Sequence, residues 1–535
     1  MKLYLGIIFM IAIVLVVGVP ALDAYSARPS VDARVLEDVA NGQVGQFLVV
    51  LKAQANARAA VARSPDRALR GQSVFDALRQ TADSSQASIR AQLDARGVNY
   101  RAYWIVNLLA VEGDQTVLNA ILARSDVAAV ESNRAFHVAL EQPTSPVARA
   151  PQSPATVEWN LSKVRAPDMW ALGHKGQGMV YANADTGVQW DHPALEPQYR
   201  GWDGTTANHN YNWWDAVHAD ISGVGTNLCN SPSGEFVALP SSGSAVPCDD
   251  QGHGTHTMGI GVGDDGAGNQ IGMAPGAKWI ACRNMDHGVG RPSTYLECYQ
   301  FFLAPTDLNG NNPDTSKRPD VVGNSYTCPI GPAPGGETCV TNSLQTGMDN
   351  MRAAGIFMAV SAGNSGSACS TISEPPAFYD SGITVGATDS GDNLAGFSSR
   401  GPITADGSDR LKPDLVAPGV GVRSSYPSYF PGECESIYCY LSGTSMASPH
   451  VAGAVALLWS AVPSLARDVD RTEFILQQSA VHLLSSQGCG GDSPSQWPNN
   501  AYGYGRIDVK AAYDLAIHVP TPSTDYFPRI ERTAQ

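Results

Sequence analysis

The feature that most constrains this chain is an alternation, after residue 156, of short continuously apolar runs with longer runs of helical spacing. Examples of the apolar runs are MVYANAD at 179–185, KWIAC at 278–282 and FMAV at 357–360. A strand that is apolar at every position has both faces buried, which is typical of a parallel sheet covered by helices on both sides. We therefore expect an α/β fold with a doubly wound, mostly parallel sheet. In such sheets ligands bind at the carboxyl ends of strands, so polar residues that directly follow a strand are candidates for a site.

A smaller unit precedes this region, at about residues 45–140. Strand-like runs such as QFLVVLK and VAAVESN are separated by two helical patterns, in one of which Val74 and Leu78 share a face. The order predicts a small ferredoxin-like α+β sheet of the β-α-β-β-α-β kind, with two helices on one side. The Pro- and Ala-rich stretch 141–156 is typical of an exposed linker.

The first residues have the pattern of an export signal. Lys2 is followed by an apolar run that ends at Val19, and Pro20 comes next. This pattern predicts a signal peptide over residues 1–21, cut after Ala21 or Ala24, and therefore a secreted, extracellular protein. The alternative is an uncleaved anchor helix, since the run is near the short limit for crossing a bilayer; the protein would then be periplasmic or membrane-anchored.

Charge and cysteine content agree with export. The formal net charge is -15, and residues 150–535 hold 37 Asp or Glu against 20 Lys or Arg. Such a surface repels phosphate groups, so we expect no nucleic-acid partner.

All ten cysteines follow residue 150, which predicts disulfides. Cys434 with Cys439, and Cys328 with Cys339, are the readiest pairs by proximity, whereas Cys282 lies in an apolar strand and has a buried thiol as its alternative.

Three polar residues stand at the ends of elements, where the fold predicts a site. Asp185 ends the run MVYANAD, His253 begins the helical run HGTHTMG, and Ser445 begins the helix SMASPHVAG. A serine hydroxyl becomes a nucleophile when a neutral imidazole takes its proton and a carboxylate orients that imidazole. Taken singly, the three have structural alternatives as a turn-forming acid, a surface histidine and a helix N-cap. Pro449 is expected near the first turn of its helix, where a missing N–H costs least.

The surrounding motifs resemble the three signature boxes of the subtilisin-like serine peptidases, or subtilases. NADTGVQWDHPAL, GHGTHTMG and SGTSMASPHVAG stand in the family's order of Asp, His and Ser, which differs from the orders of chymotrypsin-like and α/β-hydrolase enzymes. FSSRGP, LKPDLVAPG and GYGRIDVKAA are similar to other subtilase segments, and residues 282–329 resemble the bacillopeptidase F-like branch. The unit at 45–140 is similar to the inhibitory propeptide of the same enzymes.

This resemblance implies roles for particular residues. Asp185, His253 and Ser445 would form the catalytic triad. The segment SAGNSG resembles the family's oxyanion box, so Asn364 and the backbone N–H of Ser445 would stabilise the developing oxyanion. Ser325 falls in the segment VVGNSYT, where the family binds substrate and where this chain departs from the commoner SLGG or NSWG pattern.

The family's specificity pocket suggests a further residue. Aligning ITVGAT at 383–388 places Glu374 near the floor of that pocket, where a carboxylate would pair with Lys or Arg on the acyl side of the cleaved bond. A surface Glu that caps a Pro-rich loop is the alternative. With a basic preference, the bond after Arg149 becomes a candidate for self-processing.

One loop has the composition of a calcium site. DLNGNNPD alternates Asp307, Asn309 and Asn311, as loops of oxygen ligands do, but it lacks the glycine and distal glutamate of an EF-hand. A solvated turn is the alternative. We expect at most a structural calcium, and no cofactor for the chemistry.

The expected organisation is a signal peptide at 1–21, a propeptide at 22–149, a subtilisin-like catalytic domain at 150–516 and a polar tail at 517–535. The expected function is that of a secreted, self-processing serine endopeptidase that acts through an acyl-enzyme. Its partners would be protein or peptide substrates and its own propeptide, and we expect a monomer. A membrane-anchored processing protease and a catalytically silent binding protein on the same fold are the alternatives.

Overall fold

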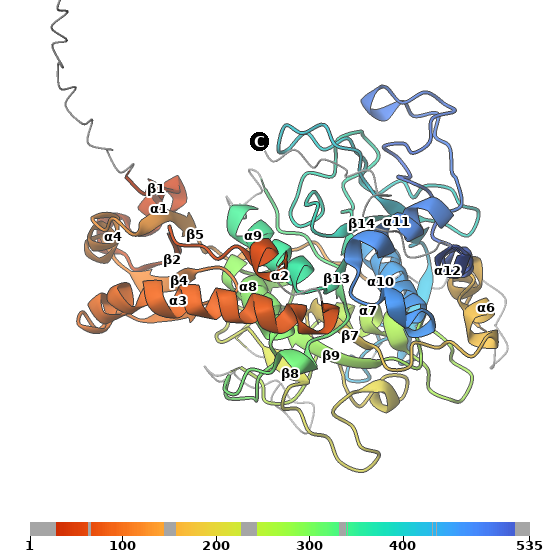
Figure 1. Cartoon of the computed structure of the whole chain (residues 1–535), viewed down its shortest axis with the longest axis horizontal. Helices are drawn as coiled ribbons and strands as arrows, with labels where there is room; N and C mark the ends of the chain where they lie inside the picture. The colour runs from red at the N-terminus through yellow and green to blue at the C-terminus, as the bar shows by residue number, and fades with distance from the viewer. Residues whose placement is uncertain are drawn as a thin grey trace, which may run out of the picture.

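The computed structural model describes residues 28–62, 66–143, 157–225, 243–330, 339, 341–430, 432–434 and 436–518. The predicted signal peptide, most of the predicted linker and the chain from residue 519 lie outside these ranges. The described residues form a small N-terminal unit and a larger unit that lie side by side (Figure 1). Among the residues described, no helix combines the length and the apolar character needed to cross a membrane.

The larger unit is built on a seven-stranded sheet with the order β15-β14-β13-β12-β7-β9-β8. Its neighbouring strands all pair in parallel, which confirms the doubly wound α/β fold expected from the continuously apolar runs. The strands are β7 (Val180–Asp185), β8 (Trp213–Asp215), β9 (Lys278–Arg283), β12 (Val321–Asn324), β13 (Phe357–Ser361), β14 (Ile383–Thr388) and β15 (Leu415–Pro418).

Helices cover both faces of this sheet. Successive residues of a strand point to opposite faces, and the core divides in the same way. Tyr181 of β7 packs in one hydrophobic cluster with α10, whereas the next residue, Ala182, packs in a second cluster with α8 and α9. The covering helices are α7 (His253–Val262), α8 (Pro292–Leu303), α9 (Thr341–Ala353) and α10 (Thr444–Ala461).

The remaining elements of the larger unit close its periphery. A hairpin of β16 and β17 packs against α7, and α12 packs against α6, α10 and α11. Because α12 runs to His518, the predicted polar tail begins within a helix. The bounds are α5 (Trp159–Lys163), α6 (Ala166–Ala171), β16 (Val422–Ser425), β17 (Tyr438–Leu441), α11 (Val469–Ser479) and α12 (Val509–His518).

The N-terminal unit contains the predicted β-α-β-β-α-β core and one strand more. Its sheet has the order β1-β5-β2-β4-β3, and the unit begins earlier than residue 45 because β1 and α1 belong to it. The core helix α3 buries residues at helical spacing, among them Val74 and Leu78. The bounds are β1 (Ser30–Val31), α1 (Ala33–Asp38), β2 (Gly45–Leu51), α2 (Ala57–Ala62), α3 (Arg70–Asp94), β3 (Tyr100–Tyr103), β4 (Leu108–Gly113), α4 (Gln115–Leu122) and β5 (Val127–Ser132).

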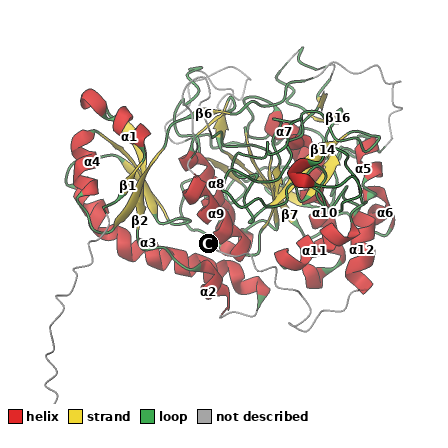
Figure 2. Ribbon diagram, turned by 90° about the horizontal axis from the view of Figure 1, so that it is seen from above, coloured by secondary structure: helices red, strands yellow, loops and turns green. Residues whose placement is uncertain are grey.

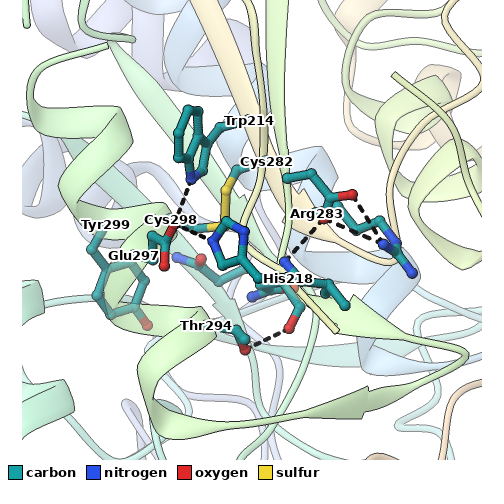
Figure 3. Close-up of a disulfide and its surroundings, with 12 residues drawn as sticks. Trp214, His218, Cys282, Arg283, Thr294, Glu297, Cys298 and Tyr299 are labelled. Atoms are coloured by element: carbon teal, nitrogen blue, oxygen red, sulfur yellow. Dashed lines mark hydrogen bonds and ion pairs between the residues drawn. A yellow bond between two sulfur atoms is a disulfide. The ribbon is translucent and has the colours of Figure 1, made fainter. Parts of the chain in front are cut away.

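The two units meet at α8 and α9, which lie between the small and the large sheet (Figure 2). Glu297 on α8 is buried at this junction and accepts hydrogen bonds from Arg101 Nη1 at 2.7 Å and Tyr103 Oη at 3.2 Å, both from β3. The same carboxylate accepts from Trp214 Nε1 at 2.8 Å and lies 2.6 Å from His218 Nε2 (Figure 3). Burial opposes the charge, but His218 and Arg101 outweigh it and hold the pKa of Glu297 below its usual value.

Disulfides tie the larger unit together. The pairs Cys328–Cys339 and Cys434–Cys439 form as proximity suggested. Cys282 is not a free thiol: it is bonded to Cys298 and so joins β9 to α8 beneath the junction (Figure 3). A fourth pair, Cys369–Cys489, closes a loop over a sequence separation of 120 residues, and Cys248 is also disulfide-bonded.

The longest loop gives a quantitative expectation. A disulfide removes more conformational entropy from the unfolded chain when the loop that it closes is longer. Replacing Cys369 and Cys489 together by Ala should therefore lower the free energy of unfolding by about 5 kcal/mol. Replacing Cys434 and Cys439 by Ala, over a separation of 5 residues, should cost only about 2 kcal/mol. Urea unfolding of both double variants in an inactive Ser445→Ala background would measure the difference. Equal losses would contradict the loop-length account.

Candidate active site

The three polar residues at element ends converge at the carboxyl edge of the parallel sheet. Asp185 is the last residue of β7, His253 is the first residue of α7, and Ser445 is the second residue of α10. Their exposed fractions are only 1%, 0% and 4%. The fold therefore brings together, out of water, three residues that lie far apart in the chain.

Asp185 and His253 are in direct contact. Asp185 Oδ1 lies 2.8 Å from His253 Nδ1. The same carboxylate accepts hydrogen bonds from the backbone N–H of Thr186 at 2.8 Å and from the hydroxyl of Thr257 at 3.2 Å. Because a carboxylate occupies Nδ1, the other ring nitrogen, Nε2, is left to exchange a proton with whatever lies in the cleft.

Ser445 sits at the start of a helix that has an unusual second turn. Pro449 lies deeper inside α10 than the sequence suggested, and it has no N–H to donate to the carbonyl of Ser445 four residues earlier. Ser325, which follows β12, donates its hydroxyl to that carbonyl at 2.9 Å and lies 2.9 Å from Ser448 Oγ. In return, the hydroxyl of Ser445 donates to the carbonyl of Ser325 at 3.1 Å.

Asn364 presents its amide N–H to the same space. The residue follows β13, and its Oδ1 accepts hydrogen bonds from the backbone N–H of Thr444 at 2.9 Å and from the Thr444 hydroxyl at 3.0 Å. With its oxygen held in this way, Nδ2 turns toward the cleft, where it donates to Glu141 at 2.8 Å. A donor fixed at this place can stabilise negative charge on an oxygen beside Ser445.

Glu141, from the N-terminal unit, fills the centre of the site. Its Oε2 lies 2.9 Å from His253 Nε2, and its Oε1 accepts from Asn364 Nδ2 at 2.8 Å. Glu141 Oε1 thus takes the hydrogen bond that Asn364 Nδ2 offers beside Ser445. Gly443 makes this approach possible, since a Cβ there would come within 1.8 Å of Glu141 Oε1.

The charges in this centre reinforce one another. Burial lowers the pKa of His253, but the carboxylates of Asp185 and then Glu141 outweigh it and raise that pKa to about 10. Burial likewise raises the pKa of Glu141, and the hydrogen bond to and charge of His253 outweigh it and leave the pKa below its usual value. The contact is therefore an ion pair of imidazolium and carboxylate.

The residues before Glu141 lie in the cleft as an added strand. β6 (Phe136–His137) pairs antiparallel with β11 (Val289–Gly290), which itself pairs with β10 (Met285–Asp286). The pairing continues to Val138, whose N–H donates to the carbonyl of Gly288 at 2.8 Å. The Phe136 ring packs edge-on against Tyr295, with ring centroids 5.3 Å apart. Adding a strand to a free edge is a common way to bind an extended peptide.

Glu374 directly precedes a residue that is hydrogen-bonded to the segment after β12. It is half-buried, and the carbonyl of the next residue, Pro375, accepts from the N–H of Cys328 at 2.6 Å. The hydroxyl of Tyr295 donates to the carbonyl of Thr327 at 3.1 Å. Burial raises the pKa of Tyr295 well above its usual value. The use of Glu374 and Ser325 in substrate binding stays a prediction.

The loop predicted for calcium forms a tight turn. Asp307 Oδ1 accepts from the backbone N–H groups of Asn309 at 2.9 Å and Asn311 at 3.0 Å. Asp307 Oδ2 accepts from Asn312 Nδ2 at 2.9 Å. Both carboxylate oxygens are thus engaged by donors of the chain itself, which matches the solvated-turn alternative. A calcium ion at this loop stays a prediction.

A second cluster of ligand-type residues lies near the site. Asp250, Asp286 and His287 have ligand atoms within 4.8 Å of one another. The buried guanidinium of Arg283 is hydrogen-bonded to both aspartates and supplies the positive charge that a metal ion would bring. The residues therefore fit an ion-pair network better than a metal site.

Comparison with known proteins agrees with this geometry. A family model described as the subtilase family matches residues 176–505, a range that contains Asp185, His253 and Ser445. The chain is a serine peptidase of the subtilase family. It is 35% identical over 492 residues to bacillopeptidase F of Bacillus subtilis strain 168, a match that covers 86% of this chain and 31% of that protein. The chain therefore spans about a third of the length of bacillopeptidase F.

Shorter subtilases match over most of their own length. The chain is 32% identical over 360 residues to subtilisin DY of Bacillus licheniformis, covering 67% of this chain and 98% of that protein. It is 28% identical over 408 residues to subtilisin E of Bacillus subtilis strain 168, covering 76% and 81% respectively. The resemblance read from the motifs is thus confirmed at the level of the family.

One residue that contacts His253 in this subtilase was not predicted from the sequence. Glu141 was assigned to the start of an exposed linker, but its side chain is only 8% exposed and lies against His253. A lone Glu before a Pro-rich stretch carries no local signal, because its partners come from three distant segments.

Proposed function

We propose that the protein is a secreted serine endopeptidase that hydrolyses peptide bonds through Asp185, His253 and Ser445 and is made as a zymogen. The observation that carries the proposal is the 2.8 Å contact between buried Asp185 and His253, at the sheet edge where Ser445 begins a helix, in a subtilase chain. The chemistry requires no cofactor, since all its proton transfers run through side chains.

The reaction follows from these positions once Glu141 has withdrawn. Ser445 Oγ attacks the carbonyl carbon of the substrate, and its proton passes to His253 Nε2 while Asp185 stabilises the imidazolium. Asn364 Nδ2 and the backbone N–H of Ser445 hold the oxyanion. The C–N bond breaks as the leaving amine takes the proton from His253. Water then attacks the acyl-enzyme with His253 as base, which releases the acid and restores Ser445.

We further propose that the N-terminal unit is the inhibitor of the zymogen. The inhibitory segment, Phe136–Glu141, supports this proposal because it occupies both the free strand edge and the triad. The buried contacts of Glu297 with Arg101 and Tyr103 anchor the unit beside the cleft. The carboxylate of Glu141 would thus block the site, and the docked N-terminal unit would hold it there.

The ion pair makes this inhibition depend on pH. Asp185 raises the pKa of His253 first and Glu141 raises it further, to about 10, so the stabilising effect of the Glu141 contact is present while His253 is protonated and is lost as the pH rises through that pKa. Contact lowers the pKa of Glu141, so the effect is also lost when the pH falls through that lowered pKa. The zymogen should therefore open most readily at alkaline pH.

Glu374 supports a proposal on specificity. A half-buried carboxylate beside the wall formed by Thr327 and Cys328 would attract Lys or Arg on the acyl side of the cleaved bond. Arg149, which such a preference makes a candidate for self-processing, lies outside the described residues.

The proposed mechanism is tested first at the nucleophile. Ser445→Ala should abolish both processing near residues 140–155 and casein hydrolysis, with a loss in kcat of about 10⁶-fold, as in a subtilisin. Ser442→Ala is a matched control, since that hydroxyl accepts from the Gly421 N–H at 2.8 Å and takes no part in the reaction. Casein assays and intact-mass analysis would report both steps. If both persist in Ser445→Ala, the mechanism is wrong.

The inhibitory role of Glu141 is tested by removing its charge. Glu141→Gln keeps the size of the side chain but cannot form an ion pair with His253, so the zymogen should process itself faster than wild type. The ratio of the two rates should be largest at neutral pH, where His253 is protonated beside the carboxylate, and should fall toward alkaline pH by at most about tenfold per unit. Taking a ratio removes the pH dependence that catalysis itself brings.

A matched control for this experiment is Glu37→Gln. Glu37 is a glutamate of the same N-terminal unit, pairs with Arg134 at 2.9 Å at the surface and has a side chain 65% exposed. Its processing rate should equal that of wild type at every pH. A Glu141→Gln zymogen that processes at the wild-type rate from pH 6.5 to 9 would show that the carboxylate does not inhibit.

The specificity proposal is tested with a peptide library. Wild type should favour Lys or Arg on the acyl side, and Glu374→Ala should lose about tenfold or more of that preference, because an ion pair in a half-buried site is worth about 1.5–3 kcal/mol. Cleavage of peptides with apolar residues at this position should change little. The proposal fails if wild type shows no basic preference, or if Glu374→Ala leaves one intact.

A further inference from the structure

Asp249 is a buried carboxylate that the proposed reaction does not use. It lies in the loop before α7 and is 0% exposed. Five hydrogen bonds end on its two oxygens. Oδ1 accepts from the Thr186 hydroxyl at 2.8 Å, the Gly252 N–H at 2.8 Å and the Gln251 N–H at 3.1 Å. Oδ2 accepts from the N–H of Thr255 at 2.8 Å and from its hydroxyl at 2.7 Å.

These bonds complete the first turn of α7, which begins at His253. The N-cap position is Gly252, which has no side chain to cap the helix and has a φ of 99°. Side chains from elsewhere satisfy the free N–H groups of this turn instead. Gln251 Oε1 accepts from His253 at 2.9 Å, and Asp249 accepts from Thr255. Asp249 therefore acts as the N-cap that Gly252 cannot be.

Asp249 also reaches the end of the strand that carries Asp185. Thr186 is the next residue after Asp185, and its hydroxyl donates to Asp249 while accepting from the Gly254 N–H at 3.0 Å. Thr255 forms a parallel link, since its hydroxyl donates to Asp249 and accepts from the Gln189 N–H at 3.0 Å. One carboxylate thus joins the end of β7 to the first turn of α7.

We propose that Asp249 is the positioning residue of the triad: it holds the β7 end and the α7 start at the spacing that lets Asp185 meet His253. This proposal rests on the proposed function of Asp185 and His253 and adds a residue to it. Asp249 touches neither the substrate nor the reacting atoms. Its effect would be to fix the 2.8 Å contact between Asp185 Oδ1 and His253 Nδ1 before substrate arrives.

The substitution Asp249→Asn tests this directly. The amide keeps the shape of the side chain but turns one oxygen into a donor, which must face either the donors of Thr255 or those of Thr186 and Gly252. Misplacing a catalytic group by about 1 Å costs up to about 10²-fold in rate. We therefore expect kcat of the mature enzyme to fall about 10- to 100-fold, with KM for a short peptide substrate within about twofold of wild type.

A pH profile separates positioning from a general loss of stability. Asp185 raises the pKa of His253, so a looser contact should move the acidic limb of the kcat/KM profile to lower pH. Asp203→Asn is the matched control: Asp203 accepts in the same manner from Thr205 and Thr206, but is exposed. Its kinetics and profile should be unchanged.

A second pair of variants covers the case in which Asp249→Asn does not fold. Thr186→Val cuts the link from Asp249 to the strand end and removes the acceptor of the Gly254 N–H, but leaves the bonds from Thr255 to Asp249 in place, whereas Thr186→Ser restores the hydroxyl. We expect Thr186→Val to lose kcat and shift the acidic limb, and Thr186→Ser to recover both. Wild-type kcat and an unshifted profile in folded Asp249→Asn, or in Thr186→Val, would overturn the proposal. Activity in Ser445→Ala would instead overturn the mechanism on which it rests.

Discussion

The parallel pairing of β7 with β12, and of β12 with β13, is the constraint on which the site depends. Ala184 pairs with Asn324, and Asn324 pairs with Val360, so these strands end in step. The residues that follow them therefore emerge on one edge, next to the start of α10. A helix that begins at this edge offers free N–H groups and a positive end, and the chain places Ser445 there. Sheet register thus sets a geometry that no local sequence specifies.

At that edge, the charged side chains are buried and paired with one another instead of being exposed to water. Asp185 and His253 are buried and in contact, and Glu141 joins them as a second carboxylate on the other side of the imidazole. A buried charge without a partner costs free energy. The carboxylate of Glu141 and the imidazolium of His253 therefore each stabilise the charged form of the other. In the proposed mechanism, Glu141 and the oxyanion of a substrate would both accept from Asn364 Nδ2.

Much of the fold was predictable from the sequence, and much of the site was not. Continuous apolar runs such as that ending at Asp185 specify strands buried on both faces, and helical spacing at Val74 and Leu78 specifies α3. The same patterns predicted both sheets.

The residues that stood out in the sequence were Asp185, His253 and Ser445, because they lie at the ends or starts of elements and within recognisable motifs. Glu141 and Asp249 did not, because their importance comes from partners supplied by distant segments. The pairing of Cys282 with Cys298 was missed for the same reason: it depends on how α8 lies on β9.

The hydrogen bond from Ser325 to the carbonyl of Ser445 has a consequence for how this sequence can change over generations. Pro449 removes the helix's own donor to that carbonyl, and Ser325 replaces it from a different segment. While Pro449 is present, loss of the Ser325 hydroxyl would leave the buried carbonyl of Ser445 without a donor. If Pro449 were replaced by a residue with an N–H, the helix itself could supply that donor and the Ser325 hydroxyl would no longer be needed for it. The two positions therefore depend on each other in the fold, although 124 residues separate them in the sequence.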